Sequence, residues 1–184
     1  DLLSKDAQEL KVTSNEVVGN VVVETTSIEQ VLQVLDLAQS RRCVKSTLSN
    51  AVSSRSHMIF TLNIAVNDRV GKLHICDLAG SERLSKSGAH HVGGALLEES
   101  KNINKSLSVL SNVIERLQAG DANVPFRESK LTLILKNSLS GNSKTLAIVC
   151  CNPDEAHVNE SLNSLRFAEK VNRVDLKAVA NFRC

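Results

Sequence analysis

The chain has 184 residues and a net charge of +2, and 42% of its residues are apolar although only 2% are aromatic. This length corresponds to one ordinary domain, with enough Leu, Val, Ile and Ala to build a core. No apolar run approaches the roughly 18 residues of a membrane span, and the first residues lack the basic-then-apolar pattern of a secretory signal. The nearly neutral charge says little about partners, and a polyanionic partner would have to bind a local basic face.

The cysteine pattern favours an intracellular, reducing compartment. The 5 cysteines show no Cys-x-x-Cys spacing, so we expect no metal bound by cysteine. Cys76 and Cys150 lie within apolar runs and are predicted to be small, buried side chains.

The first quarter of the chain predicts two short strands and a helix. Leu10–Val12 and Asn20–Glu24 look like strands around a turn. Ser27 and Gln30 have the spacing of a capping box, which predicts a helix that begins there and ends at the cations of Arg41–Arg42. The apolar positions of this helix follow a helical period: Ile28, Val31, Leu32, Leu35 and Ala38.

Two longer strands are predicted next. They run from Met58 to Val66 and from Gly71 to Asp77, on either side of a polar turn at Asn67–Asp68. If these strands are neighbours, the loop before the first and the loop after the second leave the same edge.

The second half of the chain predicts further helices and another strand. A long helix is expected from about Leu97 to Leu117, with Glu98 and Glu99 in its first turn, where the helix dipole favours anions. Its inward stripe comprises Ile103, Leu107, Leu110, Val113, Ile114 and Leu117. A shorter helix is expected over Ser129–Leu139, with Leu131, Ile134, Leu135 and Leu139 inward.

The last part of the chain completes an alternation of strands and helices, which is typical of an α/β layered sheet. Thr145–Cys151 is a continuous apolar run, the pattern of a strand buried on both faces. A last helix is predicted to be capped by Asn159 or Ser161 and to end near Val174. Its expected inward residues are Leu162, Leu165, Phe167, Ala168 and Val171.

Asp77 and Gly80 have the spacing of a phosphate-handling loop. An acid at the carboxyl end of a strand can hold Mg²⁺ through water, as the Walker-B Asp does. A glycine shortly after it lets the backbone approach a terminal phosphate and donate its N–H. By itself this spacing is weak evidence for a phosphate site, because an acid and a turn glycine are also common in ordinary loops that follow a strand.

A dense polar run, Asn50–His57, precedes the strand that begins at Met58. Its serines offer hydroxyls for a metal or phosphate, and Arg55 is a cation that can pair with Glu82 after the other strand. Such a pair would latch two loops that sense one phosphate. In isolation the run is more typical of a Ser-rich, solvated loop.

Together these segments resemble the motor domain of the kinesin family. Residues 50–57 match its switch I motif, Asn-x-x-Ser-Ser-Arg-Ser-His, and residues 77–82 match its switch II motif, Asp-Leu-Ala-Gly-Ser-Glu. The resemblance continues in Ile103–Leu107, Val124–Thr132 and Ser164–Ala168, and so covers nearly the whole chain. It implies an α/β fold, the carboxyl-terminal portion of a P-loop NTPase head with a mixed central sheet between helical layers. Residues 1–184 would form a single partial domain.

The resemblance also implies roles for individual residues. Ser54 would coordinate Mg²⁺, and Asp77 would hold it through water. Binding of ATP or ADP would involve Asn50, Ser53, Ser54, Gly80 and Asn104. The catalytic group would comprise Arg55, Glu82, Gly80 and Ser53. The acidic surface of tubulin would contact Lys101, Lys105, Arg127 and Lys130.

The implied function is a microtubule motor that couples ATP hydrolysis to movement. It would act in the cytoplasm on the microtubule cytoskeleton, including the spindle, as a homodimer joined by a coiled coil outside this chain. No nucleic-acid or membrane partner is expected. The last helix, Ser164–Val174, looks most like that of the kinesin-14 group, whose motors lie at the carboxyl terminus and move toward the minus end.

Two other functions stay open. No Gly-x-x-x-x-Gly-Lys-Ser/Thr motif is present in the chain, and its one Gly-Lys pair, Gly71–Lys72, is followed by Leu. We therefore expect the isolated chain to be inactive as an ATPase, although the complete head would be a microtubule-stimulated one. The first alternative is a non-catalytic, microtubule-binding head, against which the intact switch motifs argue. The second is an unrelated P-loop switch protein, against which the match over Val124–Thr132 argues.

Overall fold

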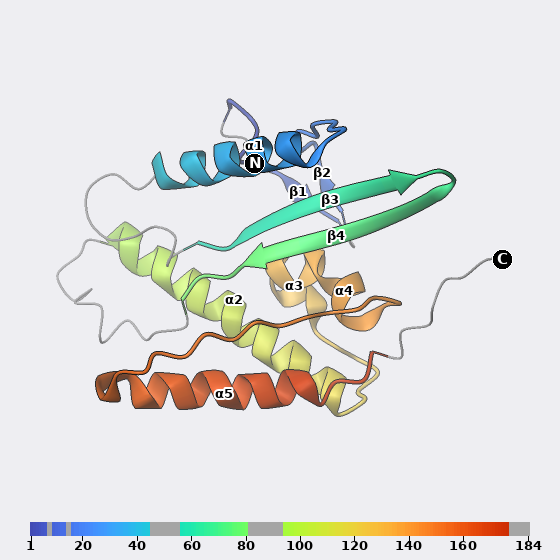
Figure 1. The fold of residues 1–184 in the computed structure, drawn as a ribbon. Helices are drawn as coiled ribbons and strands as arrows, with labels where there is room; N and C mark the ends of the chain where they lie inside the picture. The colour runs from blue at the N-terminus through green and yellow to red at the C-terminus, as the bar shows by residue number, and fades with distance from the viewer. Residues whose placement is uncertain (7–8, 14–15, 45–55, 81–93, 177–184) are drawn as a thin grey trace. The chain divides into compact units, whose positions relative to one another are not determined.

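The computed structural model describes residues 1–6, 9–13, 16–44, 56–80 and 94–176 of the chain (Figure 1). These residues belong to two compact units. The first comprises Asp1–Leu10, Gly19–Gly80 and Val92–Ile103, and the second comprises Lys11–Val18, Ser81–His91 and Asn104–Cys184. None of the described helices is long and apolar enough to span a membrane.

Helix α1 (Ile28–Val44) of the first unit begins at the predicted capping box. The hydroxyl of Ser27 accepts the backbone N–H of Gln30 at 3.3 Å. The Gln30 side chain returns to the N–H of Thr26, at 2.7 Å, rather than to that of Ser27. Ala38 is buried as predicted, and Val31 and Leu35 are half-buried, whereas the predicted inward residues Ile28 and Leu32 are exposed.

Strands β3 (Met58–Val66) and β4 (Arg69–Asp77) form a long antiparallel hairpin (Figure 1). Val66 pairs with Arg69, which leaves Asn67–Asp68 as a two-residue turn, as predicted. Asn67 has φ of 52°, a left-handed conformation that Asn tolerates and that suits such turns. At the other end Met58 pairs with Asp77. The expectation that the two strands are neighbours is therefore confirmed.

The second unit contains a short hairpin, β1 (Lys11–Val12) with β2 (Val17–Val18). The expected strand at Asn20–Glu24 is wrong, because the pairing segment comes earlier in the chain. The N–H of Thr13 bonds the Glu16 carbonyl at 2.9 Å and closes the turn at once. Within the described residues all strands belong to these two antiparallel pairs.

Helix α2 (Gly94–Gln118) supplies the centre of the second unit's core. Its buried side chains are Val109, Leu110, Val113 and Ile114, three of which belong to the predicted stripe. The helix begins three residues before the predicted Leu97, and its first turn holds no acid. The dipole argument for Glu98 and Glu99 is therefore wrong. Gly120, with φ of 71°, ends the helix in the left-handed conformation that glycine adopts easily.

The predicted helix over Ser129–Leu139 is divided into two short helices, α3 (Lys130–Ile134) and α4 (Lys136–Ser140). A 3-10 turn, η4 (Phe126–Glu128), precedes them. The hydroxyl of Ser129 accepts the N–H of Leu131 at 3.1 Å and caps α3. Leu131, Leu135 and Leu139 are buried, as their spacing predicted.

Residues 145–151 form no strand in the structure, and the prediction of a strand buried on both faces is wrong. Leu146 is 84% and Ile148 83% exposed, and Cys150 is exposed as well. A strand buried on both faces needs a neighbour on each edge and a layer on each side. The described part of the chain pairs no strand with this run.

Helix α5 (Val158–Asn172) follows a 3-10 turn, η5 (Glu155–His157). Neither predicted cap is correct: Asp154 caps the 3-10 turn, and the Ser161 hydroxyl instead contacts the backbone of Asn152, accepting its N–H at 3.1 Å. Two of the expected inward residues, Leu162 and Leu165, are exposed. Lys170 pairs with Glu115 of α2 at 3.3 Å, which joins the two helices.

Thr132 should be one of the most sensitive polar positions of the second unit. Its side chain is 0% exposed, and its hydroxyl donates to the Phe126 carbonyl at 2.8 Å and approaches the Ser129 carbonyl at 3.1 Å. Thr132→Val removes the donor and leaves a buried carbonyl unpaired, so we expect a loss of about 1–3 kcal/mol in the free energy of unfolding. Urea unfolding measures it. Thr132→Ser keeps the hydroxyl and is the control, and an equal loss in both variants would contradict the role of the hydrogen bond.

Candidate functional site

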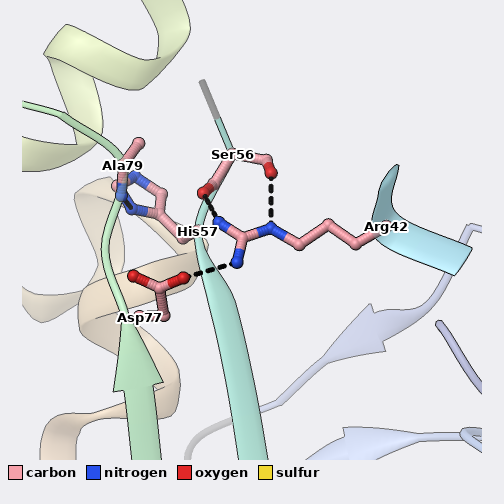
Figure 2. Close-up of polar contacts among 5 residues, drawn as sticks. All are labelled: Arg42, Ser56, His57, Asp77 and Ala79. Atoms are coloured by element: carbon pink, nitrogen blue, oxygen red, sulfur yellow. Dashed lines mark hydrogen bonds and ion pairs between the residues drawn. The ribbon is translucent and has the colours of Figure 1, made fainter. Parts of the chain in front are cut away.

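The open end of the β3–β4 hairpin brings two predicted motif segments together. Ser56–His57 precede β3, and Leu78–Gly80 follow β4, beside the terminal pair Met58 and Asp77. Figure 2 shows that the end of α1 contributes Arg42 to the same place. The predicted convergence of these segments therefore follows from the register of the hairpin.

Arg42 links three elements through one guanidinium group (Figure 2). Its Nη1 donates to Oδ2 of Asp77 at 2.5 Å, its Nε to the Ser56 hydroxyl at 3.0 Å, and its Nη2 to the Ser56 carbonyl at 2.6 Å. The Arg42 side chain is only 8% exposed, whereas that of Asp77 is 58% exposed. A planar fork of donors allows Arg to satisfy these acceptors together.

The neighbouring Arg41 has a different set of partners. Its Nη1 donates to the carbonyls of Leu2 at 3.0 Å and Leu3 at 2.8 Å, and so ties the end of α1 to the beginning of the chain. Sequence reasoning gave both arginines one role, as cations at the end of a helix dipole. The helical period alone places consecutive residues about 100° apart, which was the available signal that they serve different neighbours.

His57 joins the two segments by a second route (Figure 2). Its Nδ1 accepts the backbone N–H of Ala79 at 3.0 Å, so in this arrangement the ring is neutral and carries its proton on Nε2. Burial lowers the pKa of His57, and the Arg42 charge lowers it further while Asp77 raises it. Sequence reasoning included His57 only as the last letter of a motif and assigned it no role.

Asp77 is suited to the Mg²⁺ role that was predicted for it. Mg²⁺ usually binds one or two carboxylates together with water and phosphate oxygens. Asp77 lies at the carboxyl end of β4, and more than half of its side chain is exposed to water while Oδ2 bonds Arg42. Within the described residues no group of three or more His, Cys, Asp or Glu is close enough to hold a metal ion by itself.

The other predicted nucleotide-site residues are placed only in part. Gly80 follows the buried Ala79 at the end of a described segment. Asn104 is half-buried in α2, in the second unit. The remaining residues lie outside the described part of the chain: Asn50, Ser53, Ser54, Arg55 and Glu82. The Arg55–Glu82 latch therefore stays a prediction.

Of the predicted basic contacts, Lys105, Arg127 and Lys130 lie in the second unit, and their side chains are exposed. Lys105 belongs to α2, Arg127 to η4 and Lys130 to the first position of α3. Lys101 lies in α2, in a stretch for which only the backbone is described.

Comparisons with a family model and with individual proteins all match the chain to kinesins. The family model described as "Kinesin motor domain" matches residues 1–174. Kinesin-like protein 3 of Schizosaccharomyces pombe is 42% identical over 98% of this chain and 34% of its own length. The human Kinesin-1 heavy chain is 43% identical over 80% of this chain and 16% of its own length. The chain thus spans about a third or less of these relatives.

Two solved structures have the same fold. One, from work on mutants and a signalling pathway for activation of the kinesin motor ATPase, matches 95% of this chain with a TM-score of 0.72 and 39% identity. The other, the C-terminal motor and motor homology domain of Kar3Vik1 fused to a synthetic heterodimeric coiled coil, matches 94% with a TM-score of 0.76 and 38% identity. The chain covers 54% and 47% of those chains respectively. The predicted fold class, a portion of an α/β head of this type, is confirmed.

The bond between Arg42 and Asp77 can be measured with a double-mutant cycle. Because Asp77 is more than half exposed, we expect a coupling free energy of only about 0.5–1 kcal/mol between Arg42→Ala and Asp77→Ala in urea unfolding. The matched control is Arg41→Ala with Asp77→Ala, which should be additive because Arg41 bonds backbone carbonyls instead. Equal coupling in the two cycles would show that the hydrogen bond between Arg42 and Asp77 is not the source of the coupling.

Proposed function

Because the chain belongs to the kinesin motor domain family, we propose that the full protein couples ATP hydrolysis to movement along microtubules. The observation that carries this proposal is the family match over residues 1–174, which includes both switch motifs. The hairpin register supports it, since Ser56–His57 and Asp77–Gly80 meet at one end of β3 and β4. Microtubule-stimulated release of phosphate by the full-length protein is the direct test.

In the proposed mechanism the chain's own residues position the nucleotide and its attacking water. Gly80 donates its N–H to the γ-phosphate, and Arg55 and Glu82 close the two loops over it. Ser54 and, through water, Asp77 would hold Mg²⁺, which would supply positive charge that neutralises the phosphates. Asn50, Ser53 and Asn104 complete the contacts. Loss of the γ-phosphate would release both loops, an order–disorder switch.

The proposed microtubule surface consists of Lys105, Arg127 and Lys130, with Lys101 further along α2. All but Lys101, for which the backbone alone is described, have exposed side chains in the second unit, as a surface for an acidic partner requires. In this proposal α2, the long helix that follows switch II in the sequence, carries a change at switch II to this surface.

We also propose a subgroup, an oligomeric state and a cellular location for the full protein, which go beyond the family assignment. We assign the chain to the kinesin-14 group on the pattern of Ser164–Val174, and the Kar3Vik1 neighbour is in keeping with that assignment. Minus-end movement, a homodimer through a coiled coil, and a place on cytoplasmic and spindle microtubules follow from it. The alternative, a non-catalytic microtubule-binding head, predicts microtubule binding without stimulated hydrolysis.

Glu82→Ala in the full-length protein should abolish most hydrolysis while nucleotide still binds. The variant removes one partner of the proposed latch, and misplacing the attacking water costs about a hundredfold in rate. Steady-state turnover and the affinity for a fluorescent ADP analogue measure the two effects. Glu155→Ala, at an exposed position of η5, is the control and should behave as wild type. Normal turnover in Glu82→Ala would remove the latch from the mechanism.

A triple variant tests the microtubule surface. Lys105→Ala, Arg127→Ala and Lys130→Ala together should raise the microtubule concentration for half-maximal stimulation roughly 3- to 150-fold, because each exposed charge pair contributes only about 0.2–1 kcal/mol. Turnover without microtubules should not change. The control, Lys11→Ala, Lys72→Ala and Lys144→Ala, removes as many exposed charges elsewhere. If both triples weaken binding equally, net charge rather than the proposed surface governs the interaction.

A further inference from the structure

The strand pairing of the long hairpin ends at Met58 and Asp77, but one more hydrogen bond joins the two segments beyond this pair, between His57 and Ala79. Ala79, two residues beyond that pair, is only 5% exposed. A buried backbone N–H needs an acceptor, and beyond the last pair the ladder no longer supplies one. The imidazole of His57 takes its place, because Nδ1 accepts the Ala79 N–H at 3.0 Å (Figure 2).

This bond fixes the backbone immediately before Gly80. Only φ and ψ of Ala79 separate the anchored nitrogen from the N–H of Gly80, because the peptide units between are planar. The direction of the Gly80 N–H is therefore set by the peptide plane that joins it to Ala79, and not by φ and ψ of Gly80 itself. Two side chains thus hold the backbone that leads to Gly80: Arg42 bonds Asp77, and His57 bonds Ala79.

We propose that His57 is a positioning residue for the γ-phosphate: its Nδ1 holds Ala79 so that the N–H of Gly80 is directed at that phosphate. This inference rests on the proposed function, since it assumes that Gly80 meets the γ-phosphate of ATP. The role requires an acceptor at the Nδ1 position. It requires neither a positive charge on the ring nor contact between His57 and the nucleotide.

The position of the acceptor separates this role from simple packing. In His57→Asn the side-chain oxygen occupies nearly the place of Nδ1, one bond beyond Cγ, and can accept the Ala79 N–H. His57→Leu has a comparable volume without an acceptor. In His57→Gln the amide lies one carbon further out, so a polar group is kept but is displaced from the Nδ1 position.

The experiment measures, in the full-length protein with Mg²⁺, the affinities for ADP and for a non-hydrolysable ATP analogue. The ratio of the two reports the γ-phosphate contact. In His57→Leu and His57→Gln we expect the ATP-analogue affinity to fall about tenfold or more relative to ADP, the effect of one unmade hydrogen bond, with a parallel fall in kcat. In His57→Asn the ratio should stay within about threefold of wild type.

Melting temperatures identify any variant that fails to fold, and His57→Gln stands in for His57→Leu in that case. An unchanged ratio in the folded variants that lack the acceptor would overturn the inference, as would an equal loss of both nucleotides or a His57→Asn variant as impaired as the others. Failure of the proposed function gives a different result, because the wild-type protein itself would then bind no nucleotide or show no stimulated hydrolysis.

Discussion

The register of the β3–β4 hairpin is the constraint on which the candidate site depends. Antiparallel pairing of Met58 with Asp77 brings the end of one polar segment to the beginning of another, although they are about twenty residues apart in sequence. A slip of one residue would turn every side chain of a strand to the opposite face. Asp77 would then no longer lie within reach of Arg42, and His57 would no longer lie opposite the N–H of Ala79.

Arg42 and His57 stabilise this arrangement by different physical means. The guanidinium is almost fully buried, so its three contacts to Asp77 and Ser56 satisfy a charge that would otherwise be costly to remove from water. The imidazole is held neutral by burial and acts through a single acceptor atom. The ion pair with Arg42 thus fixes the Asp77 carboxylate, and the hydrogen bond from the Ala79 N–H to neutral His57 fixes the backbone two residues further on.

Local sequence patterns predicted those elements whose stability is itself local. The Ser27 cap of α1, the turn at Asn67–Asp68 and the stripe of α2 around Val113 depend on neighbours within a few residues, and all three are present. Predictions failed where the outcome depends on distant partners. The run at 145–151 has the composition of a buried strand, but no strand in the described residues pairs with it. Ser161 has the chemistry of a helix cap, but its hydroxyl bonds Asn152 instead. Likewise, motif spacing made Asp77 and Gly80 candidate site residues, which they remain, whereas only three-dimensional contacts could assign partners to Arg42 and His57.

The equal length of β3 and β4, nine residues each, has a consequence for how this segment can change over evolutionary time. The turn fixes one end of the pairing, and Asp77 with the candidate site lies at the other, roughly 30 Å away at about 3.3 Å per residue. Loss or gain of a single residue within one strand alters the count between these fixed points, and has to be absorbed by a bulge or matched in the partner strand. Substitutions along the middle of the hairpin leave that count intact. The hairpin therefore tolerates substitutions along its strands, but not an insertion or deletion in one strand that the other strand does not match.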